Sequence, residues 1–418
     1  MSTFPPKAPS YPDALRATAE RFGTPTYAYA ASIVRRQCRR LRTLTEGLPT
    51  RLMYAMKANP APAILDLIRA EGFGLDVVSP AELLVALRLG FAPDALLFSA
   101  SGMTEREMRL AVTQGVLPNI GDLAQLEVFG RSFPGRRVSL RINPKIGAGH
   151  HAHVVTAGKS SKFGIPLSRL DAARELLTAH DLRLVGLHQH IGSGLLEASA
   201  LGEAVQVLID TARTFEGLEF INIGGGLGTP DRPDQTPLPV DNFQTHVVER
   251  LRAFVDETPQ DLTVRLEPGR FLVAEAGTLL TRVTALKTVG DRTFALTDSG
   301  MNHLIRPALY DAYHAVYNLS NPDGAPQTYD VVGNICESGD AFARSRPVQT
   351  IRPGDVLALL DTGAYGMAMA SHYNLRALPA EVMIRPDGTL DGIRERLSDE
   401  DIAARWLQPS RPASSVPS

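Results

Sequence analysis

A single lysine ends an apolar run near the start of the chain. The stretch "LMYAMKANP" delivers Lys57 and then stops at Ala-Asn-Pro. A proline disfavours helix in the residue before it, so Lys57 should lie at or near the end of a buried strand. A lysine amine in a desolvated site has a lowered pKa and can act as a nucleophile that forms a Schiff base. The alternatives are a buried ion pair and a strand-end lysine whose amine reaches water.

A run of glycines follows another apolar stretch. Gly224, Gly225, Gly226 and Gly228 come after "LEFINI". Consecutive glycines expose backbone N–H groups without side chains that block close approach, so this turn can hold a phosphate. Ser193 could add a hydroxyl to that site. A plain tight turn is the alternative.

A lysine and a phosphate site together suggest pyridoxal 5'-phosphate (PLP), which proteins bind through a Schiff-base lysine and through its phosphate. Glu267 in "LEPGR" would then pair with the pyridine nitrogen and keep it protonated. The alternative for Glu267 is an ordinary ion pair with Arg270. His190 in "HQHIGSG" could stack on the ring, or it could be a hydrogen-bonded core histidine.

A second group of polar residues lies far along the chain, in "CESGD". There the thiol of Cys336 stands beside Glu337 in a glycine-flanked turn. Such a thiol can donate or accept a proton in catalysis. A buried cysteine that only fills space is the alternative.

The candidate residues stand at the ends of strand-like runs that alternate with amphipathic helices. The runs are 51–57, 73–79, 95–100, 137–143, 184–192, 218–226 and 262–270, and the helices are 61–71, 80–90, 104–115, 167–180, 200–215 and 241–256. Near-continuous apolar strands that alternate with helices indicate a parallel sheet. Seven or eight such units predict a (β/α)₈ barrel, whose functional residues collect at the carboxyl ends of the strands.

The pattern changes after residue 277, where strand-like runs and turns predict an antiparallel β domain of the sandwich or barrel-like type. We therefore predict a PLP-binding barrel over residues 33–276 and a β domain made of 11–32 and 277–407. The Pro- and Ser-rich ends, 1–10 and 408–418, predict disordered tails. The glycine-rich stretch 147–159 is a candidate lid.

The composition indicates which classes of binding partner and which cellular compartment to expect. The 418 residues are 44% hydrophobic and carry a formal net charge of −2, which gives no electrostatic case for nucleic acid or an anionic membrane. Two cysteines, no signal peptide and no apolar run near the ~18 residues of a membrane helix predict a cytoplasmic protein. We expect no metal at His188 and His190 or elsewhere, because the other histidines of the chain's central part, His150, His151 and His153, lie in a glycine-rich loop without nearby carboxylates or cysteines.

Six motifs, in order, resemble those of the PLP-dependent decarboxylases with an alanine-racemase-like barrel. They are "YAMKANP", "HQHIGSG", "GGGLG", "LEPGRFLV", "CESGD" and "GAYGMAMASHYN", within a match from about residue 24 to 400. The family includes diaminopimelate, ornithine and arginine decarboxylases. The stretches "MNHLIRPALYDAYH", "SSKFGI" and "YNLRALPAEVMI" are similar to the diaminopimelate branch. This resemblance implies decarboxylation of meso-2,6-diaminopimelate at its D centre, with L-lysine as the product.

The resemblance also implies roles for individual residues. Lys57 would bind PLP covalently, His190 would stack on the ring and Glu267 would bind the pyridine nitrogen. Cys336 or Lys57 would protonate the substrate carbon, and Cys336 would reach the active site of a partner subunit in a homodimer. The implied cofactor-binding set also contains Asp76, Ser193, Gly225, Gly226, Gly269, Arg270 and Tyr365; the implied substrate-binding set is Arg270, Arg306, Tyr310, Glu337 and Tyr365.

Three alternatives stay open at this point. A decarboxylase of ornithine, arginine or lysine has no distal carboxylate to bind, so an acidic residue would be expected in place of Arg306. An amino-acid racemase benefits from a weaker electron sink, so an arginine would be expected in place of Glu267. A non-catalytic PLP-binding protein would have no need of Cys336.

Overall fold

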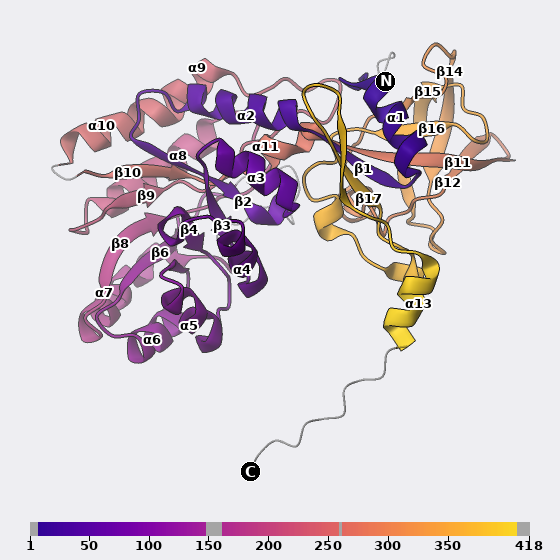
Figure 1. Ribbon diagram of the computed structural model, residues 1–418. Coiled ribbons are helices and arrows are strands. Elements are labelled where there is room, and N and C mark those ends of the chain that lie inside the picture. The colour runs from indigo at the N-terminus through magenta and orange to yellow at the C-terminus, as the bar shows by residue number, and fades with distance from the viewer. Residues whose placement is uncertain (1–6, 148–160, 259–260, 408–418) are drawn as a thin grey trace.

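The computed structural model describes residues 7–147, 161–258 and 261–407, which form a parallel barrel beside a second sheet (Figure 1). Among these residues, eight parallel strands close the barrel, because β5 pairs with β6 and β10 pairs with β2. The strands are β2 (Thr50–Ala55), β3 (Gly74–Val77), β4 (Leu96–Phe98), β5 (Leu117–Ile120), β6 (Arg137–Asn143), β8 (Arg183–His188), β9 (Phe220–Asn222) and β10 (Thr263–Leu266). A two-residue strand, β7 (Ile165–Pro166), pairs with β6 outside this ring. The predicted (β/α)₈ barrel is confirmed.

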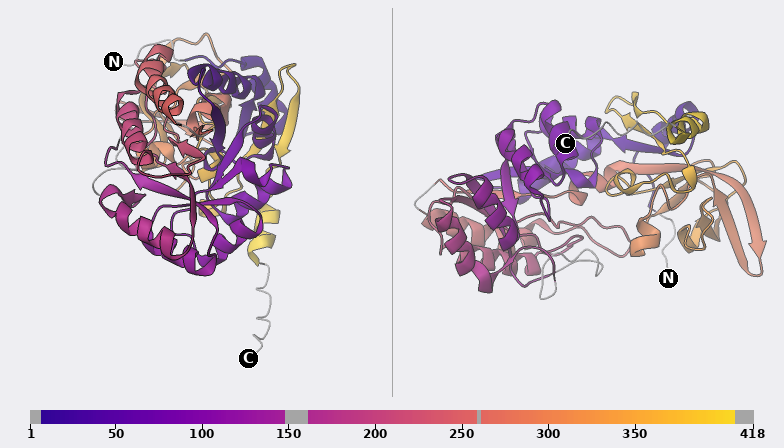
Figure 2. Two further views of the ribbon diagram at one scale, coloured as in Figure 1. Left: turned by 90° about the vertical axis from the view of Figure 1, so that its left-hand side faces the viewer. Right: turned by 90° about the horizontal axis from the view of Figure 1, so that it is seen from below.

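Helices surround the barrel strands on the outside (Figure 2). They are α2 (Ala31–Leu44), α3 (Pro62–Ala70), α4 (Pro80–Arg88), α5 (Glu105–Thr113), α6 (Leu123–Ser132), α7 (Leu170–Ala179), α8 (Ser199–Ala212), α9 (Val240–Phe243) and α10 (Glu249–Glu257), with the π-helix η5 (Gln244–Val248) joining the last two. Several begin where a short polar side chain satisfies free N–H groups: Ser79 caps α4, Thr104 caps α5 and Asp122 caps α6. These caps fix where each strand-to-helix loop ends.

Of the barrel elements, the strand β5 and the helices α2 and α6 have no counterpart among the predicted runs. β5 contains Pro118, a residue that is uncommon inside strands, so its sequence does not stand out as a strand. The ring needs it, since it fills the position between β4 and β6. The helix that follows, α6, contains Gly130 and has a weaker apolar pattern than its neighbours.

The second sheet is mixed rather than wholly antiparallel. Most pairs are antiparallel, as predicted, but β1 (Thr26–Ala30) runs parallel to β17 (Ala380–Ile384), and β12 (Arg292–Thr297) runs parallel to β14 (Pro326–Val332). The other strands are β11 (Gly277–Val289), β13 (Val316–Asn318), β15 (Ala341–Gln349), β16 (Val356–Leu359) and β18 (Leu390–Arg394). β1 precedes the barrel in the chain but lies between β11 and β17 in this sheet. The helices α1 (Pro12–Phe22), α12 (Arg306–Tyr310) and α13 (Asp399–Leu407) complete this half, and the short α11 (Arg270–Val273) leads into it.

Several sequence-based expectations fall partly or wholly outside the described residues. These are the candidate lid from residue 148 onward, the tail 408–418 and residues 1–6 of the N-terminal tail. Residues 7–10 are described, and the Nζ atom of Lys7 lies 2.7 Å from Oδ1 of Asp361. The domain boundaries stay a prediction.

The inside of the barrel is filled by side chains from strands on opposite sides. Met53, Leu97, Val185 and Phe220 form one buried cluster. Gly186 leaves room for the ring of Phe220, because a Cβ atom on Gly186 would lie 2.1 Å from that ring. The interior is thus a packed core, so only the mouth of the barrel is left for a ligand.

We predict that Gly186→Ala destabilises the protein, because the added methyl group overpacks the barrel core, which typically lowers the free energy of unfolding by about 1–3 kcal/mol. The midpoint of thermal unfolding should fall accordingly. Gly339→Ala is the matched control, since no atom lies within 4 Å of a Cβ built there. Equal midpoints for the two variants would contradict this view of the core.

Candidate active site

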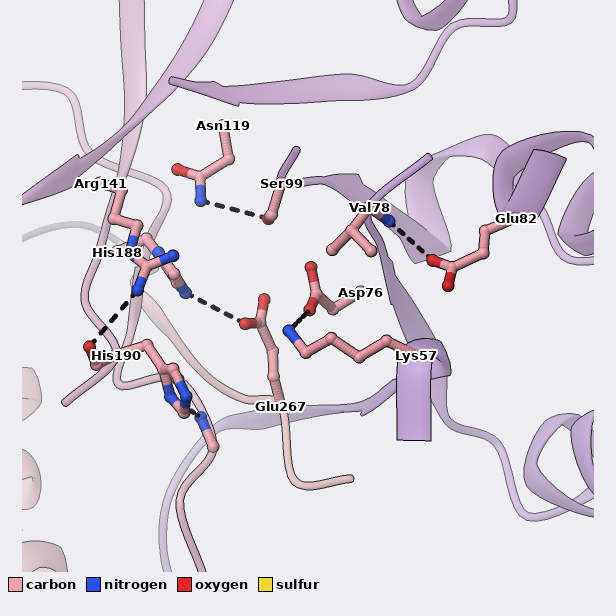
Figure 3. Close-up of polar contacts among 12 residues, drawn as sticks. Lys57, Asp76, Val78, Glu82, Ser99, Asn119, Arg141, His188, His190 and Glu267 are labelled. Atoms are coloured by element: carbon pink, nitrogen blue, oxygen red, sulfur yellow. Dashed lines mark hydrogen bonds and ion pairs between the residues drawn. The ribbon is translucent and has the colours of Figure 1, made fainter. Parts of the chain in front are cut away.

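Lys57 lies in a 3₁₀ turn, η1 (Met56–Ala58), directly after β2. Its Nζ atom is 3.3 Å from Oδ2 of Asp76, a buried residue of the neighbouring strand β3 (Figure 3). The Lys57 side chain is 41% exposed, and its partial desolvation by itself lowers the pKa of the ammonium. The acidic groups of Asp76, Tyr365 and Glu267 outweigh that effect, and the pKa is raised. The expected lowering of the Lys57 pKa is therefore wrong for this arrangement. Asp76 is the nearest group that can take the ammonium proton.

Glu267 follows β10 and lies inside the barrel mouth, with 5% of its surface exposed. Oε2 is 3.0 Å from Nε2 of His188, and Oε1 accepts a hydrogen bond of 2.5 Å from Nδ2 of Asn222. Burial alone would raise the pKa of Glu267, but His188 and Asn222 lower it overall. The alternative pairing with Arg270 is not found, because Arg270 donates from Nε to Oγ of Ser193 at 3.3 Å.

The three glycines form a tight turn pressed against the rest of the mouth. Gly224 and Gly226 have positive φ angles of 75° and 111°. A Cβ on Gly225 would lie 2.4 Å from the carbonyl oxygen of Glu267, and one on Gly224 would lie 2.3 Å from that of Gln189. Side chains are therefore excluded from this turn, as a phosphate cradle requires.

His190 is hydrogen-bonded to the same turn. The backbone N–H of Gly225 donates to Nδ1 of His190 at 3.2 Å. Burial and the positive charges of Arg141 and Lys57 hold the pKa of His190 well below its usual value. A nitrogen that accepts a backbone N–H bond carries no proton, so His190 presents a neutral ring to the cavity.

Tyr365, in the loop after β16 of the second sheet, contacts the turn that carries Lys57. Its backbone N–H donates to the carbonyl oxygen of Ala58 at 2.8 Å, and its φ angle is 58°. The guanidinium carbon of Arg270 lies 5.1 Å from the centre of the Tyr365 ring. Asn59 adds a second link, because its Nδ2 donates to the carbonyl oxygen of Gly363 at 2.9 Å.

Most of the predicted site residues line two adjoining cavities at the barrel mouth. The residues that line both are Lys57, Ser99, Arg141, His190, Ser193, Arg270 and Tyr365. The inner cavity is completed by Ala55, Asp76, His188, Gly225, Gly226, Leu227, Glu267 and Gly269, and the outer one by Val78, Ser101, Phe163, Tyr310 and Met369. The outer cavity gives a ligand bound at Lys57 a route to solvent.

Three predicted substrate or catalytic residues lie elsewhere. Arg306 is buried, donates to Nε2 of His314 at 3.1 Å, and lines a neighbouring cavity that shares Arg270 with the site. Cys336 and Glu337 are on an exposed turn, where Cys336 contacts Oδ1 of Asn374 at 3.5 Å and Glu337 accepts a hydrogen bond from the Tyr373 hydroxyl. Neither of the last two lines the cavity of its own chain.

Sequence reasoning missed Arg141 and Asn222. Arg141 on β6 lies 4.8 Å from the centre of the Phe163 ring and donates to the carbonyl oxygen of His190 at 3.5 Å. The signal that singled out Lys57, a charged residue inside an apolar strand, was also present in "RVSLRIN". Asn222 gave a weaker signal, a polar residue at the end of "FIN".

The described residues contain no group of three or more His, Cys, Asp or Glu side chains that could hold a metal ion. His150, His151 and His153 lie outside them. In the described part of the chain, no helix has both the length and the apolar character needed to cross a membrane.

We predict that Asp76→Asn lowers the pKa of Lys57, because the substitution removes the main group that raises it. The measurement is the pH dependence of acetylation of Lys57 in the apoprotein, followed by peptide mass spectrometry. Lys287, an exposed residue of β11, serves as the internal reference. A Lys57 titration that stays unchanged in the variant would contradict the assigned role of Asp76.

Comparison with known proteins identifies relatives over nearly the whole chain. Residues 31–274 match the model of the pyridoxal-dependent decarboxylase family, pyridoxal binding domain. The diaminopimelate decarboxylase of Methanothermobacter thermautotrophicus is 40% identical over 94% of both chains, and that of Pseudomonas aeruginosa is 37% identical over 95% of this chain and 96% of its own. A crystal structure of Helicobacter pylori diaminopimelate decarboxylase complexed with L-lysine aligns with a TM-score of 0.85 at 30% identity, covering 94% of this chain and 99% of that one.

Proposed function

This chain belongs to the pyridoxal-dependent decarboxylases, and we propose that it removes carbon dioxide from the D centre of meso-2,6-diaminopimelate to give L-lysine. Its relatives over nearly the full length are diaminopimelate decarboxylases. The observation that carries the chemistry is the buried, hydrogen-bonded carboxylate of Glu267, which lines the same cavity as Lys57. The protein is a PLP-dependent carboxy-lyase.

The residues of the inner cavity fit PLP. Lys57 would supply the amine for its aldehyde carbon, and Glu267 would supply the carboxylate for its ring nitrogen. When bound, PLP provides the electron sink that accepts the electron pair left by the breaking bond between Cα and the carboxylate. The glycine turn excludes side chains where the phosphate would lie, with Ser193, Gly225, Gly226, Gly269, the Arg270 backbone and Tyr365 as the proposed binding groups.

The neutral ring of His190 is the proposed stacking partner of PLP. Its position is set by the bond from Gly225, so the glycine turn would align both the phosphate and the ring face. Asp76 accepts a hydrogen bond from the Lys57 amine and is the nearest acceptor for its proton.

The substrate offers two carboxylates and two amines. Arg270, Arg306 and Tyr310 are the proposed partners of the distal carboxylate, because an arginine fork binds a carboxylate through two hydrogen bonds. Burial lowers the pKa of Arg306 to about 10, so it stays cationic at neutral pH. An acidic residue at that position would instead suit a substrate that has only a distal amine.

Cys336 and Glu337 are proposed to act in the partner subunit of a homodimer. Both are exposed and lie outside the cavity of their own chain. Apolar side chains are exposed nearby: Tyr373 and Leu375 adjoin Asn374, the residue that contacts Cys336, and they are 42% and 50% exposed. An interface that covers this surface would bring the thiol and the carboxylate to the mouth of the other barrel. We also propose a cytoplasmic location, which agrees with two free cysteines.

Carbon dioxide release from the purified protein with PLP tests the reaction and the substrate together. We expect release with meso-diaminopimelate, with L-lysine as the product, and no release with ornithine, arginine or lysine. Lys57→Ala should abolish release. Release with a basic amino acid alone would overturn the assigned role of Arg306 and leave the PLP site standing.

Mixing two inactive variants tests the shared active site. Lys57→Ala and Cys336→Ala subunits, unfolded together and refolded, should recover about a quarter of the wild-type activity, because half of the dimers would be mixed and each would hold one intact site. Each variant refolded alone is the control. A mixture no more active than its components would contradict the proposed role of the partner subunit.

A further inference from the structure

Side chains from three neighbouring barrel strands meet at the carboxylate of Glu267. His188 ends β8 and Asn222 ends β9, and the register of the two strands sets these residues side by side. Glu267 follows β10, the next strand of the ring. All three are buried, with exposed fractions of 2% for His188, 0% for Asn222 and 5% for Glu267. His188 faces one oxygen of the carboxylate and Asn222 faces the other.

A backbone hydrogen bond to the amide oxygen fixes the orientation of the Asn222 side chain. The backbone N–H of Gly224 donates to Oδ1 of Asn222 at 2.9 Å, so the atom that faces this donor must be the oxygen. The amide nitrogen therefore faces Oε1 of Glu267 and donates to it. The backbone of Gly224 is packed so closely against Gln189 that a Cβ atom built on it would collide with the Gln189 carbonyl oxygen. The Gly224 N–H therefore has little freedom to turn elsewhere.

This polarity determines where a proton can lie on Glu267. A proton on Oε1 would face the N–H group of Asn222, so Oε1 must act as an acceptor. Nε2 of His188 lies 3.0 Å from Oε2 and is the second donor in the tautomer that carries the ring proton on Nε2. A buried carboxyl group without donors would take up a proton, since burial penalises its charged form. Two donors from adjacent strands reverse that preference.

We propose that His188 and Asn222 are positioning residues that hold Glu267 as an oriented carboxylate for the ring nitrogen of the cofactor, with the Gly224 amide setting the direction of the network. The inference rests on the proposed PLP chemistry and extends it to two residues that need not touch the substrate. It also gives the glycine turn a second task besides the phosphate: its first two N–H groups orient Asn222 and His190.

The test compares two ligands of the apoprotein: PLP, and its carbocyclic analogue in which C–H replaces the ring nitrogen. Both ligands form the same bond with Lys57 and the same phosphate contacts, so the difference in affinity isolates the ring nitrogen. We expect His188→Leu to weaken PLP binding by about tenfold, the effect of one charge-assisted hydrogen bond, and to change binding of the analogue by less than about twofold. Asn222→Leu should act in the same direction.

Conservative and structural controls sharpen the comparison. His188→Gln places an amide nitrogen near the position of Nε2 and should restore most of the preference for PLP. In a Glu267→Gln background, His188→Leu should add no further loss of that preference, because the two residues act as one unit. Ser139→Ala is the control for burial, since Ser139 is a buried barrel residue that bonds Asn119 and Gly186 and does not touch Glu267.

Equal weakening of both ligands by His188→Leu would show a merely structural role and overturn the proposal. The same holds if His188→Gln behaves like His188→Leu, or if the loss persists in the Glu267→Gln background. Should His188→Leu fail to fold, Asn222→Leu and His188→Gln carry the comparison. A wild-type protein that binds neither ligand would instead contradict the proposed function.

Discussion

A carboxylate inside a protein keeps its charge only where hydrogen-bond donors or cations surround it, and the mouth of this barrel is organised around that requirement. Glu267 has its donors on two adjacent strands, and Asp76 faces the ammonium of Lys57. The parallel barrel makes this possible, because its strands all end at one rim and bring polar residues from distant parts of the chain within bonding distance. Positive and negative groups therefore lie beside one another across the cavity.

Contacts from the second sheet help to fix the position of Lys57. The loop that follows β16 places Gly363 so close to the carbonyl oxygen of Val273 that a Cβ there would lie 1.9 Å from it. The same loop accepts a bond from Asn59 and donates one to Ala58, the two residues after Lys57. The position of Lys57 thus depends on contacts from both halves of the molecule, although the residue itself belongs to the barrel.

The fold and the centre of the site were largely predictable from the sequence, because each rests on a local pattern. Lys57, His190 and Glu267 are polar residues at the ends of apolar runs, and parallel strands bring such ends together. Asn222 was missed because its importance lies in a bond to a residue 45 positions away. The strand that holds Pro118 was missed because its place in the ring is decided by its neighbours rather than by its own composition.

Other parts of the site could not be placed from local patterns. The family resemblance assigns Arg306 to the substrate, yet its side chain bonds His314 and lines an adjoining cavity. Cys336 lies on the surface of its own chain. The direction of the Lys57 pKa was also wrong, because burial was weighed without the acidic residues that tertiary structure sets around the amine.

The position of β1 has a consequence for synthesis on the ribosome. β1 pairs with β17 from Thr26 to Ala30, and the partner of Thr26 is Ala380. At translation rates of roughly 5–20 residues per second, β1 emerges about 20–70 s before that partner exists. The whole barrel is made within this interval. The nascent chain must therefore keep its first strand unpaired until β11 is made. The second edge of β1 is paired only when β17 is made and synthesis is nearly finished.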